Sequence, residues 1–255
     1  MLTSQQLGQY AADGYCLIKG FFDMPEVTSF RDRARLDLQS EIELGEMMEK
    51  GDKEGRRTLL KLWNEAGDDL YGYVARDQRL VDTSVDIIGR ATYLYSHKMT
   101  MKEPFKGGAW EWHQDFGYWY QNKCLAPEML SIWIALDPSL KENGCLQVLS
   151  GSHHLGRIDH LRVNDQTVVD EEYLEAALKR FDRVYVEMDP GDALVFHCNL
   201  LHRSDANTSA MQRWGYIASY NAVGNEPFRD VREYGRYHEL VPLRAGTFVS
   251  ATAEI

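Results

Sequence analysis

The sequence contains no apolar run that approaches the roughly 20 residues needed to cross a bilayer. Its first residues, Met1 to Gln6, also lack the charged segment and following apolar segment that mark a secretory signal. We therefore expect a cytoplasmic protein that is not bound to a membrane.

Cysteine is scarce, and its four residues are scattered at Cys16, Cys124, Cys145 and Cys198. No C-x-x-C pair occurs, so neither a zinc ribbon nor a dithiol redox motif is indicated.

Basic residues are fewer than acidic ones, with 28 Lys and Arg against 39 Asp and Glu and a net charge of −11. Binding to nucleic acid or to an anionic membrane requires basic stripes. We therefore expect a small-molecule substrate and neither of those partners, and nothing in the sequence specifies an oligomeric state.

Apolar residues are plentiful enough for a packed core, because 44% of the 255 residues are hydrophobic and 11% are aromatic. We treat residues 1–255 as a single domain whose first part, residues 1–90, is mainly helical. A helix is predicted from Ser4, and it breaks at Asp13-Gly14 before a short strand.

A second helix is predicted to open at Asp23-Met24-Pro25, where proline is tolerated in the first turn. Apolar residues then continue at broadly helical spacing, with an exposed loop expected at Gly51-Asp52-Lys53-Glu54-Gly55. These apolar residues are Leu36, Leu38, Ile42, Leu59, Leu60, Leu62 and Trp63.

After about residue 90, short segments rich in aromatic and β-branched residues alternate with turns that contain Gly, Pro and Asn. They cover residues 91–101, 129–136, 145–149, 184–186, 193–196 and 214–218. A helical insert is expected near residues 170–180. Many short strands without alternating helices are typical of a barrel or a jelly roll. We predict a mainly β fold with helices, in which residues 91–225 form the β core behind a helical N-terminal extension.

The segment Trp112-His113-Gln114-Asp115 contains a histidine and an aspartate two positions apart. In an extended chain both side chains lie on one face and can bind one metal ion together. A third ligand is available at His202, after the predicted strand that ends near Phe196. Two histidines and one carboxylate on one face of an ion are typical of non-haem Fe(II) oxygenases. A His-x-Asp pair alone, however, more often belongs to a surface strand or makes an ordinary hydrogen bond.

Arg213 strengthens the functional interpretation, since it follows His202 by eleven positions (213 − 202 = 11) and opens the last strand. A planar guanidinium binds a carboxylate through two hydrogen bonds, and a buried arginine requires such a partner. A dicarboxylate that binds iron at one end needs an anchor of this kind at the other. The alternative is a solvated arginine at the end of a strand.

Several motifs in one order resemble the phytanoyl-CoA dioxygenase family of 2-oxoglutarate-dependent oxygenases, which share a double-stranded β-helix (jelly-roll) core. The similarity runs from about Ser96 to Asn221. Its motifs are Trp112-His113-Gln114-Asp115, the segment from Asn143-Gly144 to Gly151-Ser152-His153, and the segment from Gly191-Asp192 to Leu201-His202. Near the N-terminus, Asp13-Gly14-Tyr15 before an apolar strand also resembles the start of the family's sequences.

The resemblance implies that Fe(II) is bound by His113, Asp115 and His202, and that 2-oxoglutarate and O₂ are co-substrates. It assigns the distal carboxylate of 2-oxoglutarate to Arg213. Trp133, Lys98 and Thr100 are expected to line the co-substrate pocket. His197 lies five positions before His202 (202 − 197 = 5), and we interpret it as a core or supporting histidine rather than a ligand. Because Asp115 retains the carboxylate that halogenating relatives lack, hydroxylation is the expected reaction.

The substrate is expected to lie between the loops that flank these ligands, and we assign Tyr118, Arg157, His160 and Asn199 to it. The aromatic residues after Asp115 suit an apolar chain or an ammonium group, although they also suit the core of a barrel. Arg157 and His160 suit an anionic head. The combination is similar to bacterial family members that hydroxylate small aminoalkylphosphonates, so we predict a small anion or zwitterion as substrate.

Three alternatives remain open from the sequence. A fatty acyl-CoA or other apolar substrate is the runner-up, and against it no basic cluster or glycine-rich nest is evident for the CoA phosphates. The chain could also be a non-catalytic relative that binds metal and ligand as a sensor. It could finally be a zinc hydrolase that uses the same three ligands, although no general base is evident beside them.

Overall fold

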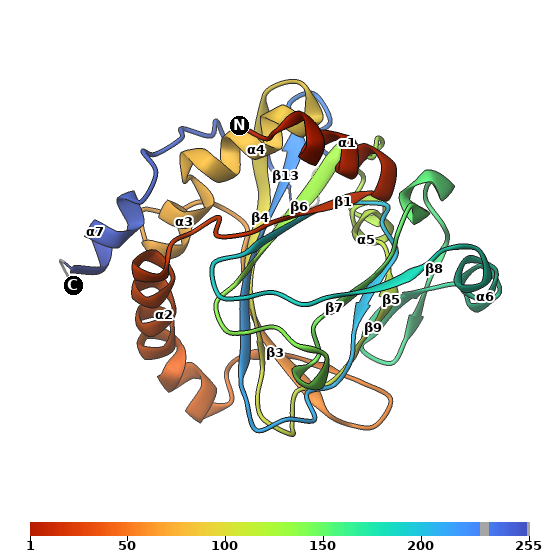
Figure 1. Cartoon of the computed structure of the whole chain (residues 1–255), viewed down its shortest axis with the longest axis horizontal. Coiled ribbons are helices and arrows are strands. Elements are labelled where there is room, and N and C mark those ends of the chain that lie inside the picture. The colour runs from red at the N-terminus through yellow and green to blue at the C-terminus, as the bar shows by residue number, and fades with distance from the viewer. Residues whose placement is uncertain (230–234, 254–255) are drawn as a thin grey trace.

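Two antiparallel β-sheets face each other in the computed structural model, which describes residues 1–229 and 235–253 (Figure 1). The large sheet has the strand order β1 (Tyr15–Ile18), β11 (Ala193–His197), β6 (Met129–Ala135), β13 (Arg213–Ala222), β4 (Thr92–Lys102), β3 (Arg57–Trp63), β2 (Met48–Gly51). The small sheet has the order β10 (Arg183–Val186), β7 (Leu146–Leu149), β12 (His202–Ser204), β5 (Trp110–His113). Such crossing connections between two packed sheets form a jelly roll, so the predicted fold class is confirmed.

The central strands of the large sheet are buried on both faces, which explains their nearly continuous apolar sequences. On β13, Trp214, Tyr216 and Ala218 point outward into the main apolar core, together with Met99 and Met101 of β4. The residues between them point to the opposite face because side chains alternate along a strand. That inner face, between the sheets, carries most of the polar groups described below.

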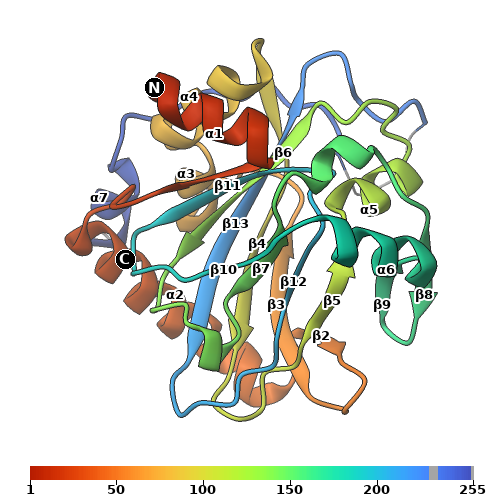
Figure 2. The ribbon, with the colours of Figure 1, turned by 45° about the vertical axis from the view of Figure 1, so that its right-hand side comes forward.

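Helices cover the outer face of the large sheet. Figure 1 shows α2 (Met24–Leu44), α3 (Leu70–Ala75) and α7 (Thr247–Ala253) on one side of this sheet, with β5 and β7 on the other. Figure 2 shows α1 (Ser4–Asp13) and α4 (Gln78–Ile88) near the N-terminal strand β1. Both predicted N-terminal helices are confirmed: α1 is capped by Thr3, and α2 is capped by Asp23 with Pro25 in its first turn.

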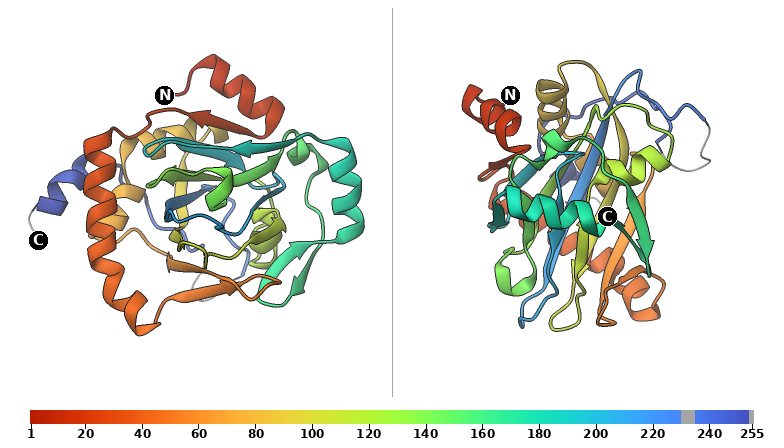
Figure 3. Two further views of the ribbon diagram at one scale, coloured as in Figure 1. Left: turned by 60° about the horizontal axis from the view of Figure 1, so that its bottom comes forward. Right: turned by 90° about the vertical axis from the view of Figure 1, so that its right-hand side faces the viewer.

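On the far side of the small sheet, α6 (Glu171–Arg180) follows a separate hairpin of β8 (His160–Val163) and β9 (Gln166–Val169). The left view of Figure 3 shows α6 and α2 at opposite ends of the enclosed strands. The helical insert predicted near residues 170–180 is therefore confirmed. Short 3₁₀ turns at η1 (Lys141–Asn143) and η2 (Ser152–Leu155) lie on either side of β7.

The helical expectation for Leu59, Leu60, Leu62 and Trp63 is wrong, since these residues form β3. This strand pairs with β2 and with β4, and Leu59 lies opposite Met101. Apolar residues at positions 59, 60, 62 and 63 satisfy a helical period and a strand with two apolar faces equally well. The segment forms a strand because it pairs with β4, and the local sequence does not specify that pairing. The loop expected at residues 51–55 is the turn of the β2–β3 hairpin.

All four cysteines are free thiols buried in the interior. Within residues 1–229 and 235–253, none of the helices combines the length and the apolar character that a membrane span requires.

Candidate metal centre and its cavities

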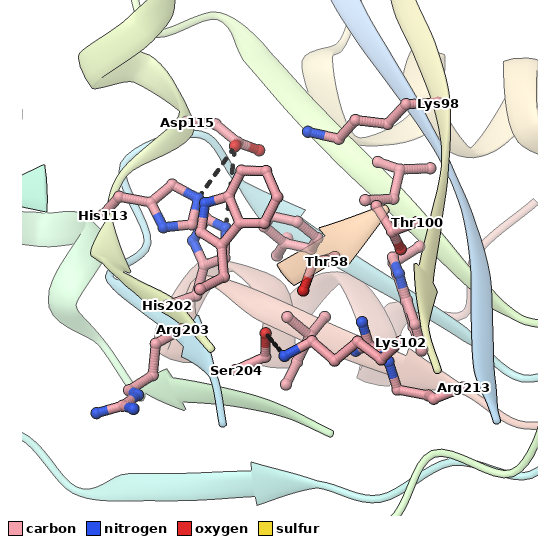
Figure 4. A pocket seen from close by; sticks show the side chains of 15 residues that line it. Thr58, Lys98, Thr100, Lys102, His113, Asp115, His202, Arg203, Ser204 and Arg213 are labelled. Carbon is pink, nitrogen blue, oxygen red and sulfur yellow. Dashed lines mark hydrogen bonds and ion pairs between the residues drawn. The ribbon is translucent and has the colours of Figure 1, made fainter. Parts of the chain in front are cut away.

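Three ligand-type side chains meet between the sheets. His113 is the last residue of β5, and His202 is the first residue of β12, directly opposite it in the small sheet. Asp115 is the first residue of α5 (Asp115–Gln121). Its Oδ1 lies 3.8 Å from Nε2 of His113 and 3.9 Å from Nε2 of His202 (Figure 4). Their ligand atoms all lie within 4.8 Å of one another, and all three side chains are buried.

The expectation that His113 and Asp115 lie on one extended strand holds only in part. The strand ends at His113 and a helix begins at Asp115. Gln114 between them has an extended backbone, with φ −113° and ψ 135°, so the alternation of side chains continues for one more residue. Asp115 therefore faces the same point as His113.

Hydrogen bonds at the far side of each imidazole fix its tautomer. Nδ1 of His113 donates to the carbonyl of Glu111 at 2.8 Å, and Nδ1 of His202 donates to the carbonyl of Leu200 at 2.9 Å. Because a carbonyl only accepts, Nδ1 carries the proton and the lone pair of Nε2 faces Asp115. Burial lowers the pKa of both histidines, and for His113 the neighbouring His202 lowers it further. Both rings are thus neutral and ready to bind a metal.

Asp115 is oriented through its second oxygen. Oδ2 accepts a hydrogen bond of 2.7 Å from the hydroxyl of Ser131, which lies 3.0 Å from the hydroxyl of Ser219. Oδ1 is left facing the two Nε2 atoms. A divalent cation about 2.1 Å from each ligand atom fits between them, and this ligand set leaves positions open for other molecules. The residues therefore fit a non-haem Fe(II) site.

Gln114 braces the backbone between two of these ligands. Its side-chain amide is fully buried and donates to the carbonyls of Gly156 and Asn199, both at 2.7 Å, and it accepts from the N–H of Ile158 at 2.8 Å. Its own backbone N–H donates to Nε2 of His160 at 2.9 Å. Two separate segments, residues 156–160 and the segment of Asn199, thus hold the turn from β5 into α5.

An inner cavity extends from the triad along the inner face of the large sheet. Arg213 and Trp133 lie at its far end, and the guanidinium carbon of Arg213 is 5.2 Å from the indole centroid. Thr100 and Lys98 contribute from β4. The structure thus brings the four predicted co-substrate residues together around one cavity with the triad. Its other lining residues are Thr58, Lys102, Trp110, Leu146, Phe196, Arg203, Ser204 and Ile217.

Gly215 makes room for Trp133. A Cβ at position 215 would lie 2.3 Å from the indole, so only glycine allows the ring to lie against β13 between the sheets.

Lys102 is a fully buried cation of this cavity that the sequence analysis missed. A pattern could have revealed it, because Lys98, Thr100 and Lys102 alternate along β4 and share its inner face. Of these three, the family resemblance assigns only Lys98 and Thr100 to the co-substrate pocket.

An outer cavity opens from the same triad toward the solvent. Lys98 and Trp110 line both cavities and mark their junction. Tyr118 lines the outer one, where its ring packs edge-on against His113 with centroids 5.6 Å apart, and its hydroxyl donates to the carbonyl of Thr167. The remaining lining residues are Met48, Lys50, Leu60, Leu62, Tyr95, Ser96, Trp119, Gln121, Asn122, Arg162 and Asp165.

Of the four residues assigned to the substrate, only Tyr118 lies where it was expected. Arg157 points to a different surface depression, where it pairs with Asp159 at 2.8 Å and covers the ring of Tyr120. His160 and Asn199 line neither cavity of the triad. Both act behind it, through the contacts with Gln114 described above.

The physical reason for this difference is that residues 156–160 turn back over α5. The imidazole of His160 lies against Gly117, and the side chain of Arg157 continues outward past α5. Arg157 therefore does not face either cavity at the triad.

The chain is similar to known proteins in sequence and in fold. The sequence model of the phytanoyl-CoA dioxygenase family (PhyH) matches residues 10–215, which include the triad and Arg213. The L-proline trans-4-hydroxylase of Streptomyces griseoviridis is 32% identical over 181 residues, or 65% of this chain and 68% of that protein. The ectoine dioxygenase of Sphingopyxis alaskensis is 28% identical over 240 residues, or 88% and 77%. The apo crystal structure of EctD from S. alaskensis has a TM-score of 0.77 at 26% identity, covering 96% of this chain and 88% of that one.

Replacing Gln114 by leucine should weaken Fe(II) binding by about 10- to 100-fold, which is the usual effect of losing a group that orients metal ligands. The ligands themselves remain, but the turn that aims His113 and Asp115 loses three hydrogen bonds. Anaerobic Fe(II) titration measures the change. The exposed Gln5 on α1 supplies the control, Gln5→Leu, which should bind as the wild type does. Equal affinity in Gln114→Leu and wild type would show that the brace does not position the ligands.

Proposed function

The chain belongs to the phytanoyl-CoA dioxygenase family, and we propose that His113, Asp115 and His202 hold its iron ion. It is an Fe(II)- and 2-oxoglutarate-dependent dioxygenase that hydroxylates a small molecule. When bound, Fe(II) with 2-oxoglutarate and O₂ supplies the oxidising chemistry, in which 2-oxoglutarate becomes succinate and CO₂ and one oxygen atom enters the substrate.

The residue assignment rests on the inner cavity, which has a different kind of binding group at each of its two ends. Neutral imidazoles and a carboxylate lie at one end, and the guanidinium of Arg213 lies at the other. A 2-oxo acid with a second carboxylate matches both ends, because its oxo-acid group suits a metal and its distal carboxylate suits an arginine.

Arg213 has the properties expected of such an anchor. It is 3% exposed, and among the described residues its N–H groups find one acceptor, the carbonyl of Gly144 at 3.0 Å. Its Nε is buried and has no hydrogen-bond partner among these residues. Burial lowers its pKa to about 10, so the side chain still carries its charge near neutral pH. A buried cation with free donors beside a cavity favours an incoming carboxylate.

Other cavity residues orient the co-substrate and exclude water. Trp133 covers one wall of the inner cavity, and Phe196 and Ile217 provide further apolar surface. Ser131 keeps Asp115 aimed at the ion site. These groups hold the reacting molecules in place, and the two sheets keep bulk water from the reaction.

For the substrate we propose a small zwitterion, such as an amino acid or an aminoalkylphosphonate, bound in the outer cavity. Lys98 lines both cavities at the triad, and Figure 4 shows its amino group pointing toward Asp115. Within the described part of the chain it has no acidic partner within ion-pair distance. Arg162 and Lys50 line the outer cavity and not the inner one, and Trp110 and Tyr118 supply the aromatic faces that suit an ammonium group.

An acyl-CoA fits this cavity less well. The carbon to be hydroxylated must lie near the triad, and an acyl chain would place its methylene groups against the ammonium of Lys98. Burying a charge against hydrocarbon is unfavourable unless the charge is paired. A small carboxylate or phosphonate pairs with it instead. The relatives named as acting on proline and on ectoine support a substrate of this size.

Arg213→Ala should raise the KM for 2-oxoglutarate by about 30-fold or more, because breaking one side of a buried, charge-assisted pair costs about 2–5 kcal/mol. The variant should still fold without co-substrate, which its thermal unfolding transition checks, because among the described residues the lost side chain donates only to the carbonyl of Gly144. Initial rates of succinate formation measure the KM. The exposed Arg183 gives the control, Arg183→Ala, which should behave as the wild type. An unchanged KM in Arg213→Ala would refute the anchor role.

A panel assay tests the substrate class. Succinate formed from 2-oxoglutarate with Fe(II) and O₂ should rise when small zwitterions are added, and not when acyl-CoAs or hydrolase substrates are added. Lys98→Met should raise the KM for the active zwitterion by about 10- to 100-fold, as expected for the loss of a hydrogen bond to a charged group. Arg157→Met should leave it within about twofold, because that side chain lies outside both cavities. Stimulation by acyl-CoA alone, or a loss in Arg157→Met rather than in Lys98→Met, would contradict the proposal.

A further inference from the structure

The inner cavity contains a second buried cation at the same end as Arg213. Lys102 is the last residue of β4, and in the antiparallel pairing of β4 with β13 it lies directly opposite Arg213. Opposite residues of neighbouring strands point to the same face of a sheet. Both side chains therefore enter the cavity from one wall, and Figure 4 shows them side by side.

Both cations are almost completely removed from solvent, with 0% of Lys102 and 3% of Arg213 exposed. Like charges directly opposite each other destabilise a sheet, and burial removes the water that would screen them. Repulsion from Arg213 adds to burial in lowering the pKa of Lys102 well below its ordinary value. The pair therefore stores an unfavourable interaction in the empty cavity.

Within the part of the chain that the structure describes, no carboxylate forms an ion pair with either cation. Nζ of Lys102 donates to the hydroxyl of Ser204 at 2.8 Å and to the backbone carbonyl of Asp205. The carboxylate of Asp205 is turned elsewhere, to Arg203 at 2.7 Å and to the side chain of Gln147. Among residues 1–229 and 235–253, no acidic side chain lies within ion-pair distance of Lys102 or Arg213.

The surrounding backbone is shaped to hold this pair. The carbonyl of Gly144 accepts from Arg213, and a Cβ at position 144 would lie 3.3 Å from Nζ of Lys102 and 2.2 Å from the carbonyl oxygen of Asp205. Gly144 also has φ +82°, which favours glycine. The turn after η1 thus closes the end of the cavity over both cations.

We propose that Lys102 is a second anchor for the distal carboxylate of 2-oxoglutarate, which it shares with Arg213. This inference rests on the proposed function and adds a residue to the co-substrate site. One carboxylate has two oxygens and accepts from both cations at once, so its binding replaces the repulsion between Lys102 and Arg213 by two charge-assisted contacts.

The inference also concerns selectivity among 2-oxo acids. Two cations at a fixed distance from the metal ligands favour a second carboxylate at the far end of the molecule. They disfavour a 2-oxo acid that ends in a methyl group, which would leave both charges buried without a partner. Lys102 should thus contribute to selection of a dicarboxylate, and not merely to tight binding.

The test is a comparison of two ligands by anaerobic calorimetry on the Fe(II)-loaded enzyme. 2-Oxoglutarate carries the distal carboxylate, and 2-oxopentanoate has the same five-carbon chain with a methyl group in that place. Lys102→Met should weaken binding of 2-oxoglutarate by about 30-fold or more. It should leave binding of 2-oxopentanoate unchanged or stronger. Lys106→Met, at an exposed lysine four positions later (106 − 102 = 4), should bind both ligands as the wild type does.

A merely structural Lys102, which only ties β4 to Ser204, predicts an equal loss for both ligands, and that result would overturn the inference. Unchanged binding of 2-oxoglutarate in Lys102→Met would overturn it as well, while the proposed function stands. A wild type that binds no 2-oxoglutarate would overturn both. If the methionine variant does not fold, Lys102→Gln keeps a donor for Ser204 and removes only the charge, so the same comparison applies.

Discussion

The site depends on one antiparallel pairing, that of β5 with β12 in the small sheet. It places His202 directly opposite His113, although 89 positions separate them in sequence (202 − 113 = 89). Each ring is held from behind by a backbone carbonyl within two residues of itself, so both lone pairs point to one place. Asp115 joins them because the chain stays extended for one residue before α5 begins. Metal geometry thus follows from backbone hydrogen bonding rather than from long flexible side chains.

The large sheet supplies the opposite half of the site under a different constraint. Its strands must be apolar outward, where helices cover them, so functional groups are restricted to alternate residues that point inward. The polar inward residues include two buried cations, Arg213 and Lys102, and no acidic side chain of the described residues forms an ion pair with them. This arrangement is unfavourable for an empty cavity and favourable for one that holds a dicarboxylate. The two unpaired cations lower the stability of the empty protein, and binding of a dicarboxylate between them restores it.

The sequence predicted the jelly roll, the triad and Arg213 because these depend on the order of the motifs and on the alternation of side chains along a strand. It could not predict β3, because Leu59–Trp63 satisfies both periods and only its partner strand decides. Arg157 was misplaced for a related reason, since a turn of unknown course separates it from the motif that positions it. The alternation of side chains along β4 that places Lys98 on the inner face also places Lys102 there. Its role was not evident from the sequence because it depends on Arg213, the residue opposite it on β13. Local patterns give the strands, whereas tertiary pairing determines which side chains meet.

An anaerobic crystal structure of the Fe(II) and 2-oxoglutarate complex tests the two-ended cavity most directly. The account predicts one iron ion bound by His113, Asp115 and His202, with the oxo-acid end of 2-oxoglutarate on that ion. It also predicts the distal carboxylate within hydrogen-bonding distance of both Arg213 and Lys102. Iron bound elsewhere, or a distal carboxylate that points into the outer cavity toward Lys98, would contradict it.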